Sequence, residues 1–187
     1  MTCIMKVLML DAGPGPTSTT AVALEEIRRQ LEQEGVEPEI LCIGDDPTQG
    51  GVDRAVRTMA DMAEETDGYV FACQGHFGVA NSCLATVLHR FFNTGAVCVN
   101  KPVSAVITCR RSGGTSALAE LNSFFTMKGM PLVSSTYWNV LVGSTPEMVK
   151  QDAEGLKTMR NLARNMAWML KSIEAGKAAG LEKPALE

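Results

Sequence analysis

Short runs of apolar residues alternate along this chain with segments in which apolar positions recur every three or four residues. The runs predict β-strands at residues 4–10, 39–43, 68–73, 102–109 and 131–134. The periodic segments predict α-helices at residues 19–34, 52–63, 84–91, 116–128 and 146–175. Because parallel strands require helical crossovers, this alternation predicts an α/β fold. We expect a three-layer doubly wound sandwich with a five-stranded parallel sheet.

No repeat or linker divides the 187 residues, so we expect a single domain at residues 1–175 and a charged C-terminal tail at residues 176–187. Hydrophobic residues make up 45% of the chain, which is enough to offset ordering entropy and excludes a disordered protein. The net charge of −4 argues against a nucleic-acid partner. No apolar run approaches the roughly 20 residues of a membrane span, and the N-terminus lacks a signal-peptide pattern. We therefore expect a cytoplasmic protein.

Six cysteines are spread along the chain, and no two of them are separated by only two residues. Zinc and iron–sulfur sites take clustered ligands, and the chain has only two histidines, so we expect no metal site. A disulfide framework is not expected in a reducing compartment. We interpret several of the cysteines as small buried apolar side chains.

The loop after the first predicted strand is rich in glycine, proline and hydroxyl residues. Its sequence is Gly13-Pro14-Gly15-Pro16-Thr17-Ser18-Thr19-Thr20, and it opens a helix. Ligands of open parallel sheets bind beyond the carboxyl ends of the strands, and free N–H groups at a helix start bind phosphate. The sequence matches neither a Walker loop nor a G-x-G-x-x-G loop. This loop is a candidate phosphate site, and the alternative is a turn with a redundant helix cap.

Two more glycine-bearing loops follow the third and fourth predicted strands. They read Cys73-Gln74-Gly75-His76-Phe77-Gly78-Val79 and Cys109-Arg110-Arg111-Ser112-Gly113-Gly114-Thr115. In the first loop, glycines allow a flat ligand to approach the backbone, and the ring of Phe77 offers a stacking plane unless it belongs to the core. His76 is a candidate acid–base residue, with a plain loop residue as the alternative. In the second loop, the paired arginines are candidates to hold an anion, against the alternative of an ordinary solvated loop.

These three loops, in this order, resemble those of the flavodoxin-like NAD(P)H-dependent FMN reductases. Where that family carries G-S-P-R-x-x-S/G-N-T, this chain keeps Pro14 and Thr20 but lacks the serine and the arginine. Residues 73–79 occupy the place of the family's S-P-V-H/Y-F/Y-G/A-S loop, and residues 110–115 resemble the A-R-R-A-G-T-T loop of one subgroup. The stretches that resemble this subgroup best are residues 134–139, 152–156 and 164–168.

The iron–sulfur flavoprotein branch of these proteins carries a compact cysteine cluster after the second strand. This chain has Asp45-Asp46-Pro47 at that place, so we set that branch aside.

The resemblance implies the flavodoxin strand order 2-1-3-4-5, FMN at the strand ends, and a homodimer or homotetramer. It implies that the phosphate contacts come from Gly13, Thr17, Ser18, Thr19 and Thr20. It implies that the isoalloxazine lies among Gly75, His76, Phe77, Gly78, Cys109, Arg110, Arg111, Ser112 and Gly113.

The activity implied is hydride transfer from NAD(P)H through FMN to a quinone, flavin, azo compound or similar acceptor, with His76 as a candidate proton donor. The altered first loop supports an alternative, a flavodoxin-fold binding or assembly protein that has lost flavin turnover. An electron carrier is a further alternative, although carriers usually present a more acidic docking face than a net charge of −4 indicates.

Overall fold

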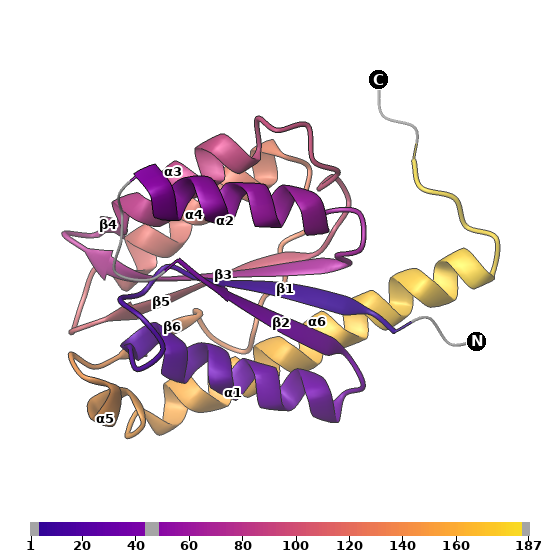
Figure 1. The fold of residues 1–187 in the computed structure, drawn as a ribbon. Helices are drawn as coiled ribbons and strands as arrows, with labels where there is room; N and C mark the ends of the chain where they lie inside the picture. Colours follow the sequence, from indigo (N-terminus) through magenta and orange to yellow (C-terminus); the bar gives the residue numbers. More distant parts are fainter. Residues whose placement is uncertain (1–3, 44–48, 185–187) are drawn as a thin grey trace.

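A central parallel sheet organises the fold in the computed structural model, which describes residues 4–43 and 49–184 (Figure 1). Its strands are β1 (Lys6–Asp11), β2 (Glu37–Cys42), β3 (Gly68–His76), β5 (Val103–Cys109) and β6 (Val140–Val142). They pair in the order β2-β1-β3-β5-β6, and each of these neighbouring pairs is parallel. Apart from the short strand β4 (Val79–Ala80), which pairs only with β3, this is the predicted order 2-1-3-4-5. That prediction is confirmed.

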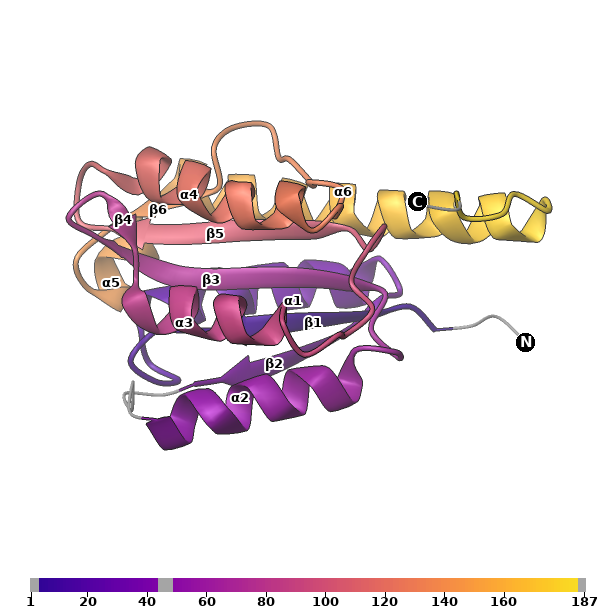
Figure 2. The same ribbon diagram turned by 90° about the horizontal axis from the view of Figure 1, so that it is seen from above.

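Helices cover both faces of the sheet. On one face lie α1 (Thr19–Gln33) and α6 (Ala153–Ala178), and on the other lie α2 (Gln49–Met62), α3 (Ser82–Phe91) and α4 (Gly114–Met127) (Figure 1, Figure 2). Buried residues form two apolar clusters, and alternate residues of β3 belong to different clusters: Tyr69 and Phe71 to one, Val70 and Ala72 to the other. Since successive strand side chains point to opposite faces, each cluster fills one side of the sheet. The predicted three-layer sandwich is confirmed.

The predicted fifth strand at residues 131–134 is wrong. Leu132 forms only an isolated bridge with Val103, and β6 pairs with the other end of β5. Between these two pieces the chain leaves the sheet, where the hydroxyl of Ser135 donates to the carbonyl oxygen of Thr158 in α6 (2.6 Å). The edge of the sheet is therefore filled by two short segments instead of one strand.

The single helix predicted at residues 146–175 is two helices, a one-turn α5 (Pro146–Val149) and then α6. Asp152 separates them by capping α6: its Oδ1 accepts from the N–H of Gly155 at 2.9 Å, and its Oδ2 accepts from the N–H of Val142 at 2.8 Å. α6 continues to Ala178, past the expected start of the tail. The division into a domain and a tail otherwise stays a prediction.

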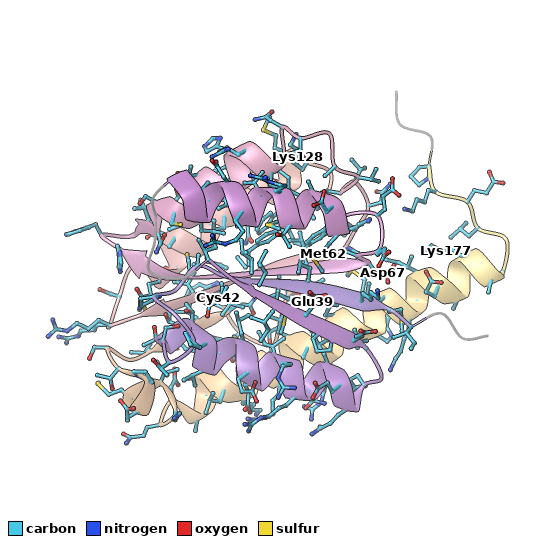
Figure 3. All side chains as sticks on the ribbon, in the orientation of Figure 1. Glu39, Cys42, Met62, Asp67, Lys128 and Lys177 are labelled. Atoms are coloured by element: carbon cyan, nitrogen blue, oxygen red, sulfur yellow. The ribbon has the colours of Figure 1, made fainter. Side chains whose placement is uncertain are left out.

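The two ends of the sheet face opposite sides of the molecule. Figure 3 shows Cys42 towards the carboxyl end of β2, and Asp67 and Lys177 towards the other end. The three candidate loops all follow carboxyl ends, of β1, β3 and β5, and so gather at one end of the sheet. In the part of the chain that the structure describes, no helix has the length and apolar character needed to cross a membrane.

Candidate functional site

The loop between β1 and α1 is closed by a network of short polar contacts. The Oδ1 atom of Asp11, the last residue of β1, accepts hydrogen bonds from the N–H of Gly13 (2.8 Å) and from the hydroxyl of Thr20 (2.6 Å). The Oγ atom of Ser18 lies 2.8 Å from Oγ1 of Thr20 and accepts from the N–H of Ala21 at 3.1 Å, which makes Ser18 the N-cap of α1. Asp11, Ser18 and Thr20 are all buried. The network therefore lies inside the protein.

Three backbone N–H groups of this loop have no acceptor within the described residues, namely those of Thr17, Thr19 and Thr20. Thr19 and Thr20 form the first turn of α1, where unsatisfied N–H groups and the helix dipole together favour an anion. Pro14 and Pro16 have no N–H to add. We define as the candidate phosphate cradle the N–H groups of Thr17, which is exposed, and of Thr19 and Thr20, which are buried.

A hollow of about 180 Å³ lies where the carboxyl ends of β3 and β5 meet the start of α1. The residues that line it are Thr19, Gln74, Gly75, His76, Thr108, Cys109, Arg110, Gly143 and Ser144. Thr19 ties α1 to both strands, because its Oγ1 lies 2.8 Å from Oγ1 of Thr108 and accepts from Nε2 of Gln74 at 3.2 Å. Thr19 therefore belongs both to the cradle and to the wall of the strand-end hollow.

β3 extends beyond the sheet into a hairpin that the sequence did not predict. Phe77 and Gly78 form a two-residue turn with φ angles of 52° and 81°, and β4 returns antiparallel to β3. Positive φ at both central residues is typical of a type I′ turn, but it is strained for phenylalanine. The hydroxyl of Ser116 in α4 donates to the carbonyl oxygen of Gly78 at 2.6 Å and fixes the turn. The side chain of Phe77 is fully exposed, so the alternative of a core residue is wrong.

The two arginines that follow β5 face different hollows. Arg110 lines the strand-end hollow, whereas Arg111 lines a second hollow of about 280 Å³ together with Ser112, Gly113 and the exposed residues Tyr137 and Trp138. Gly113 has a φ of 88° and is the N-cap of α4, with no side-chain capping bond. The structure thus brings Arg110, but not Arg111, beside Thr19 and His76.

Cys109 stands between the two hollows and lines both. Its side chain is buried, and burial raises the pKa of the thiol although N–H groups of Gly114 and Arg111 donate to the sulfur and lower it. Because the raised pKa keeps the sulfur in its thiol form at neutral pH, this position favours packing over nucleophilic attack.

The other described cysteines lie on separate elements. Cys42 ends β2, Cys73 is in β3, Cys83 is in α3 and Cys98 precedes β5. Three of them, Cys73, Cys83 and Cys98, are buried like Cys109, which confirms the interpretation of several cysteines as packing residues. Burial also raises the pKa of Cys73 to about 12. Within residues 4–43 and 49–184, no group of three or more histidine, cysteine, aspartate or glutamate side chains is placed to hold a metal ion.

The predicted contacts are therefore divided over three places. Thr19, Gly75, His76, Cys109 and Arg110 line the strand-end hollow, and Arg111, Ser112 and Gly113 line the second hollow. Thr17 and Ser18 line a groove of about 530 Å³ between α1 and α5. Gly13 and Thr20 lie in the Asp11 network, and Phe77 and Gly78 form the hairpin turn.

Sequence reasoning missed five polar or glycine residues of the site: Asp11, Gln74, Thr108, Gly143 and Ser144. Asp11, Gln74 and Thr108 lie at or near the carboxyl ends of β1, β3 and β5, and Gly143 directly follows β6. A polar residue that ends an otherwise apolar strand is the signal that could have revealed the first three.

Comparison with known proteins identifies the family. The family model of the NADPH-dependent FMN reductases matches residues 5–143. An iron-sulfur flavoprotein of Methanocaldococcus jannaschii is 26% identical over 196 residues, which cover 91% of this chain and 100% of that protein. The segment in which we expected the cysteine cluster of that branch carries Asp45-Asp46-Pro47 here and lies outside the described residues.

Solved structures share the fold at low sequence identity. RosB, crystallised with the bound intermediate 8-demethyl-8-formylriboflavin-5′-phosphate, superposes with a TM-score of 0.72 at 15% identity and covers 98% of this chain and 90% of its own. The flavodiiron core of Flv1 from Synechocystis matches with a TM-score of 0.65 at 14% identity. That match covers 92% of this chain but only 37% of the longer Flv1 chain. The matched fold, together with a family model that spans most of the sequence, shows that this chain belongs to the NADPH-dependent FMN reductase family.

Proposed function

We propose that the protein binds FMN and passes electrons from NAD(P)H to a small acceptor such as a quinone, a flavin or an azo compound. The observation that carries this proposal is that Thr19 belongs both to the candidate phosphate cradle and to the wall of the strand-end hollow. A flavin mononucleotide needs such an arrangement, because its phosphate and its ring are joined by a short ribityl chain. The family assignment and the iron-sulfur flavoprotein relative support a flavin as the ligand.

The residues of the site fit this cofactor. The N–H groups of Thr17, Thr19 and Thr20 are unused donors at a helix N-terminus, and they would hold the phosphate. The backbone near Gly75 and the guanidinium of Arg110 would border the isoalloxazine in the strand-end hollow. When bound, FMN supplies the hydride and electron chemistry, while the protein supplies placement.

Two side chains have proposed roles towards the reactants. Arg110 would offer a cation to the ring edge or to the pyridine nucleotide, since it lines the hollow and makes no ion pair among the described residues. His76 is exposed at the end of β3 and would donate a proton to an acceptor. The exposed ring of Phe77, held beside α4 by the hairpin, would present an aromatic plane above the same end of the sheet.

A specific observation favours the second candidate, a flavodoxin-fold binding protein without flavin turnover. The first loop carries Gly15 where the resemblance places an arginine, and the hydroxyls of Ser18 and Thr20 are engaged inside the protein. Such a cradle offers phosphate fewer side-chain donors. A binding protein of this kind would hold flavin weakly and would not oxidise NAD(P)H.

We also propose a homodimer or homotetramer in the cytoplasm. The support for self-association is the set of large aromatic side chains left exposed on α6 and on the loop before β6, namely Tyr137, Trp138 and Trp168. Exposed aromatic side chains of this size are typical of interfaces.

The test is a titration of the purified protein with FMN, followed by NAD(P)H oxidation with a quinone. Saturable quenching of flavin fluorescence together with NAD(P)H oxidation supports the reductase. Quenching without oxidation supports the binding protein or an electron carrier. The absence of quenching contradicts all three flavin functions, the reductase, the binding protein and the carrier. Thr19→Val, which removes the hydroxyl that joins the cradle to the hollow, is expected to weaken FMN binding by about tenfold. The matched control is Ser172→Ala on α6, whose exposed hydroxyl bonds only within its own helix.

A further inference from the structure

We propose that Asp11 is a specificity-determining residue: its buried carboxylate weakens phosphate binding at the cradle and so narrows the preference of the flavin site for FMN over riboflavin. This inference rests on the proposed function and deepens it. It concerns a residue that the sequence resemblance did not include among the contacts.

The hydrogen-bond directions in the loop follow from proton counting. A carboxylate only accepts, so the single hydroxyl proton of Thr20 points to Asp11. In the contact between Thr20 and Ser18, the proton must then come from Ser18, whose Oγ in turn accepts from the N–H of Ala21. Both hydroxyl protons are therefore used inside the protein. Neither is available to a phosphate ester unless the network opens.

The charge of Asp11 has no cationic partner. Its hydrogen-bond donors are the neutral groups of Gly13 and Thr20, and no ion pair of the described residues includes it. Two carboxylates of the groove between α1 and α5, in contrast, are paired: Glu25 with two arginines of α1 and Glu26 with Arg160. Burial raises the pKa of Asp11, which reflects the cost of a charge held away from water.

Asp11 also lies directly behind the cradle. Its Oδ1 is bonded to Thr20, whose own N–H is one of the three cradle donors. A negative charge at this place opposes the positive end of the α1 dipole, which is the attraction that a bound phosphate would use. The expected result is a cradle that accepts a phosphate dianion less readily than its unused N–H groups alone indicate.

The absence of a side chain at Gly13 leaves the space that the hydroxyls of Ser18 and Thr20 occupy. A Cβ at Gly13 would lie 1.9 Å from Oγ1 of Thr20 and 2.7 Å from Oγ of Ser18. The serine that the resemblance places at this position therefore cannot coexist with the observed network. Glycine at position 13 and the inward network of Ser18, Thr20 and Asp11 therefore depend on each other.

The test compares FMN with riboflavin, because the two differ only in the phosphate. In Asp11→Asn the side chain keeps its shape and its accepting oxygen but loses its charge. We expect the dissociation constant of FMN to fall by about tenfold and that of riboflavin to change less than about twofold. The charge-matched control is Glu147→Gln, which removes an exposed carboxylate from the groove between α1 and α5. It should change the dissociation constants of FMN and riboflavin little. Asp11→Ser is a second uncharged variant for the case in which Asp11→Asn does not fold.

A second measurement separates this inference from the proposed function. Inorganic phosphate needs no isoalloxazine site, so we expect it to raise the Tm of Asp11→Asn more than that of the wild type. A larger phosphate effect on Asp11→Asn supports the role of Asp11 even if neither FMN nor riboflavin binds. Failure of both flavins to bind would reject only the proposed function. An unchanged ratio of FMN to riboflavin affinity, or an equal phosphate effect on both proteins, overturns the inference.

Discussion

The loops after β1 and β5 each lead from a parallel strand into a helix, yet they present opposite chemistry. In the first loop, a buried carboxylate accepts from the hydroxyl of Thr20, which in turn contacts the hydroxyl of Ser18, and the N-cap is a side chain. In the second loop, the N-cap Gly113 provides no side-chain bond, and Arg110 and Arg111 are exposed. The first loop therefore offers shape and backbone donors, while the second offers positive charge. The proposed anion binding at this end of the sheet would use both.

Among the substitutions that test this difference between the two loops, Gly13→Ala is expected to have the largest effect on stability. In Gly13→Ala the new methyl group would collide with Thr20 and Ser18, which belong to a buried network and have no room to withdraw. We expect unfolding in urea to show a loss of about 2–4 kcal/mol and flavin binding to disappear.

The control for this substitution is Gly50→Ala in α2, where nothing lies within 4 Å of the new Cβ. It should change stability by less than about 1 kcal/mol, in the stabilising direction. If the two variants behave alike, the Asp11 network is not what closes the first loop.

The second loop is tested by removing its arginines one at a time. Arg110→Ala is expected to weaken FMN binding by about tenfold, because Arg110 lines the strand-end hollow. Arg111→Ala faces the second hollow and should change FMN binding by less than about twofold. Fluorescence titration of both variants measures the difference, and equal effects would contradict the separation of the two side chains.

The pH dependence of stability sharpens the contrast for the first loop. Burial raises the pKa of Asp11 above its ordinary value of 3.8, while the bonds from Thr20 and Gly13 lower it and only partly offset the rise. The native state then binds this proton more tightly than the unfolded state, so the free energy of unfolding falls as the pH rises through the folded pKa. Asp11→Asn lacks this component. The free energy of unfolding of Asp11→Asn minus that of the wild type should therefore increase as the pH rises through the folded pKa of Asp11, and stay constant at higher pH. A difference between the two proteins that does not change with pH, measured by urea unfolding, would contradict the assignment.

The smallest change in stability is expected at the hairpin that extends from β3, the strand between β1 and β5. Phe77 holds a φ of 52°, which asparagine tolerates better than phenylalanine. Phe77→Asn should therefore raise the free energy of unfolding by about 0.5–1 kcal/mol and, if the ring contacts a reactant, raise the KM for the acceptor. A destabilised variant would mean that the exposed ring contributes to folding.

Much of this fold follows from the order of the residues, because strands buried on both faces read as continuous apolar runs and glycine or proline marks their ends. The edge strand was misplaced because residues 131–134 and β6 are both short and apolar. Contacts of Ser134, Ser135 and Thr136 with α6 hold the chain between these two segments away from the sheet. The break between α5 and α6 depends on Asp152, which bonds to β6 as well as to its own helix. Such long-range partners leave no periodic signal.

The sequence predicted that the three loops follow strand ends, and the structure places them at one end of the sheet, but the directions of their side chains were not predicted. Arg110 and Arg111 are neighbours in the sequence and yet line different hollows, because the backbone bends directly after β5 ends at Cys109. Asp11 directly follows the strand predicted at residues 4–10, and its partner Thr20 lies nine residues later. Its role emerges only when the loop closes.

The most direct test is a crystal structure of the protein with FMN. We expect the phosphate on the N–H groups of Thr17, Thr19 and Thr20, and the ring in the hollow bordered by Gly75 and Arg110. A flavin seated instead in the second hollow beside Trp138, or a phosphate far from the start of α1, would contradict a flavin site built from these two loops.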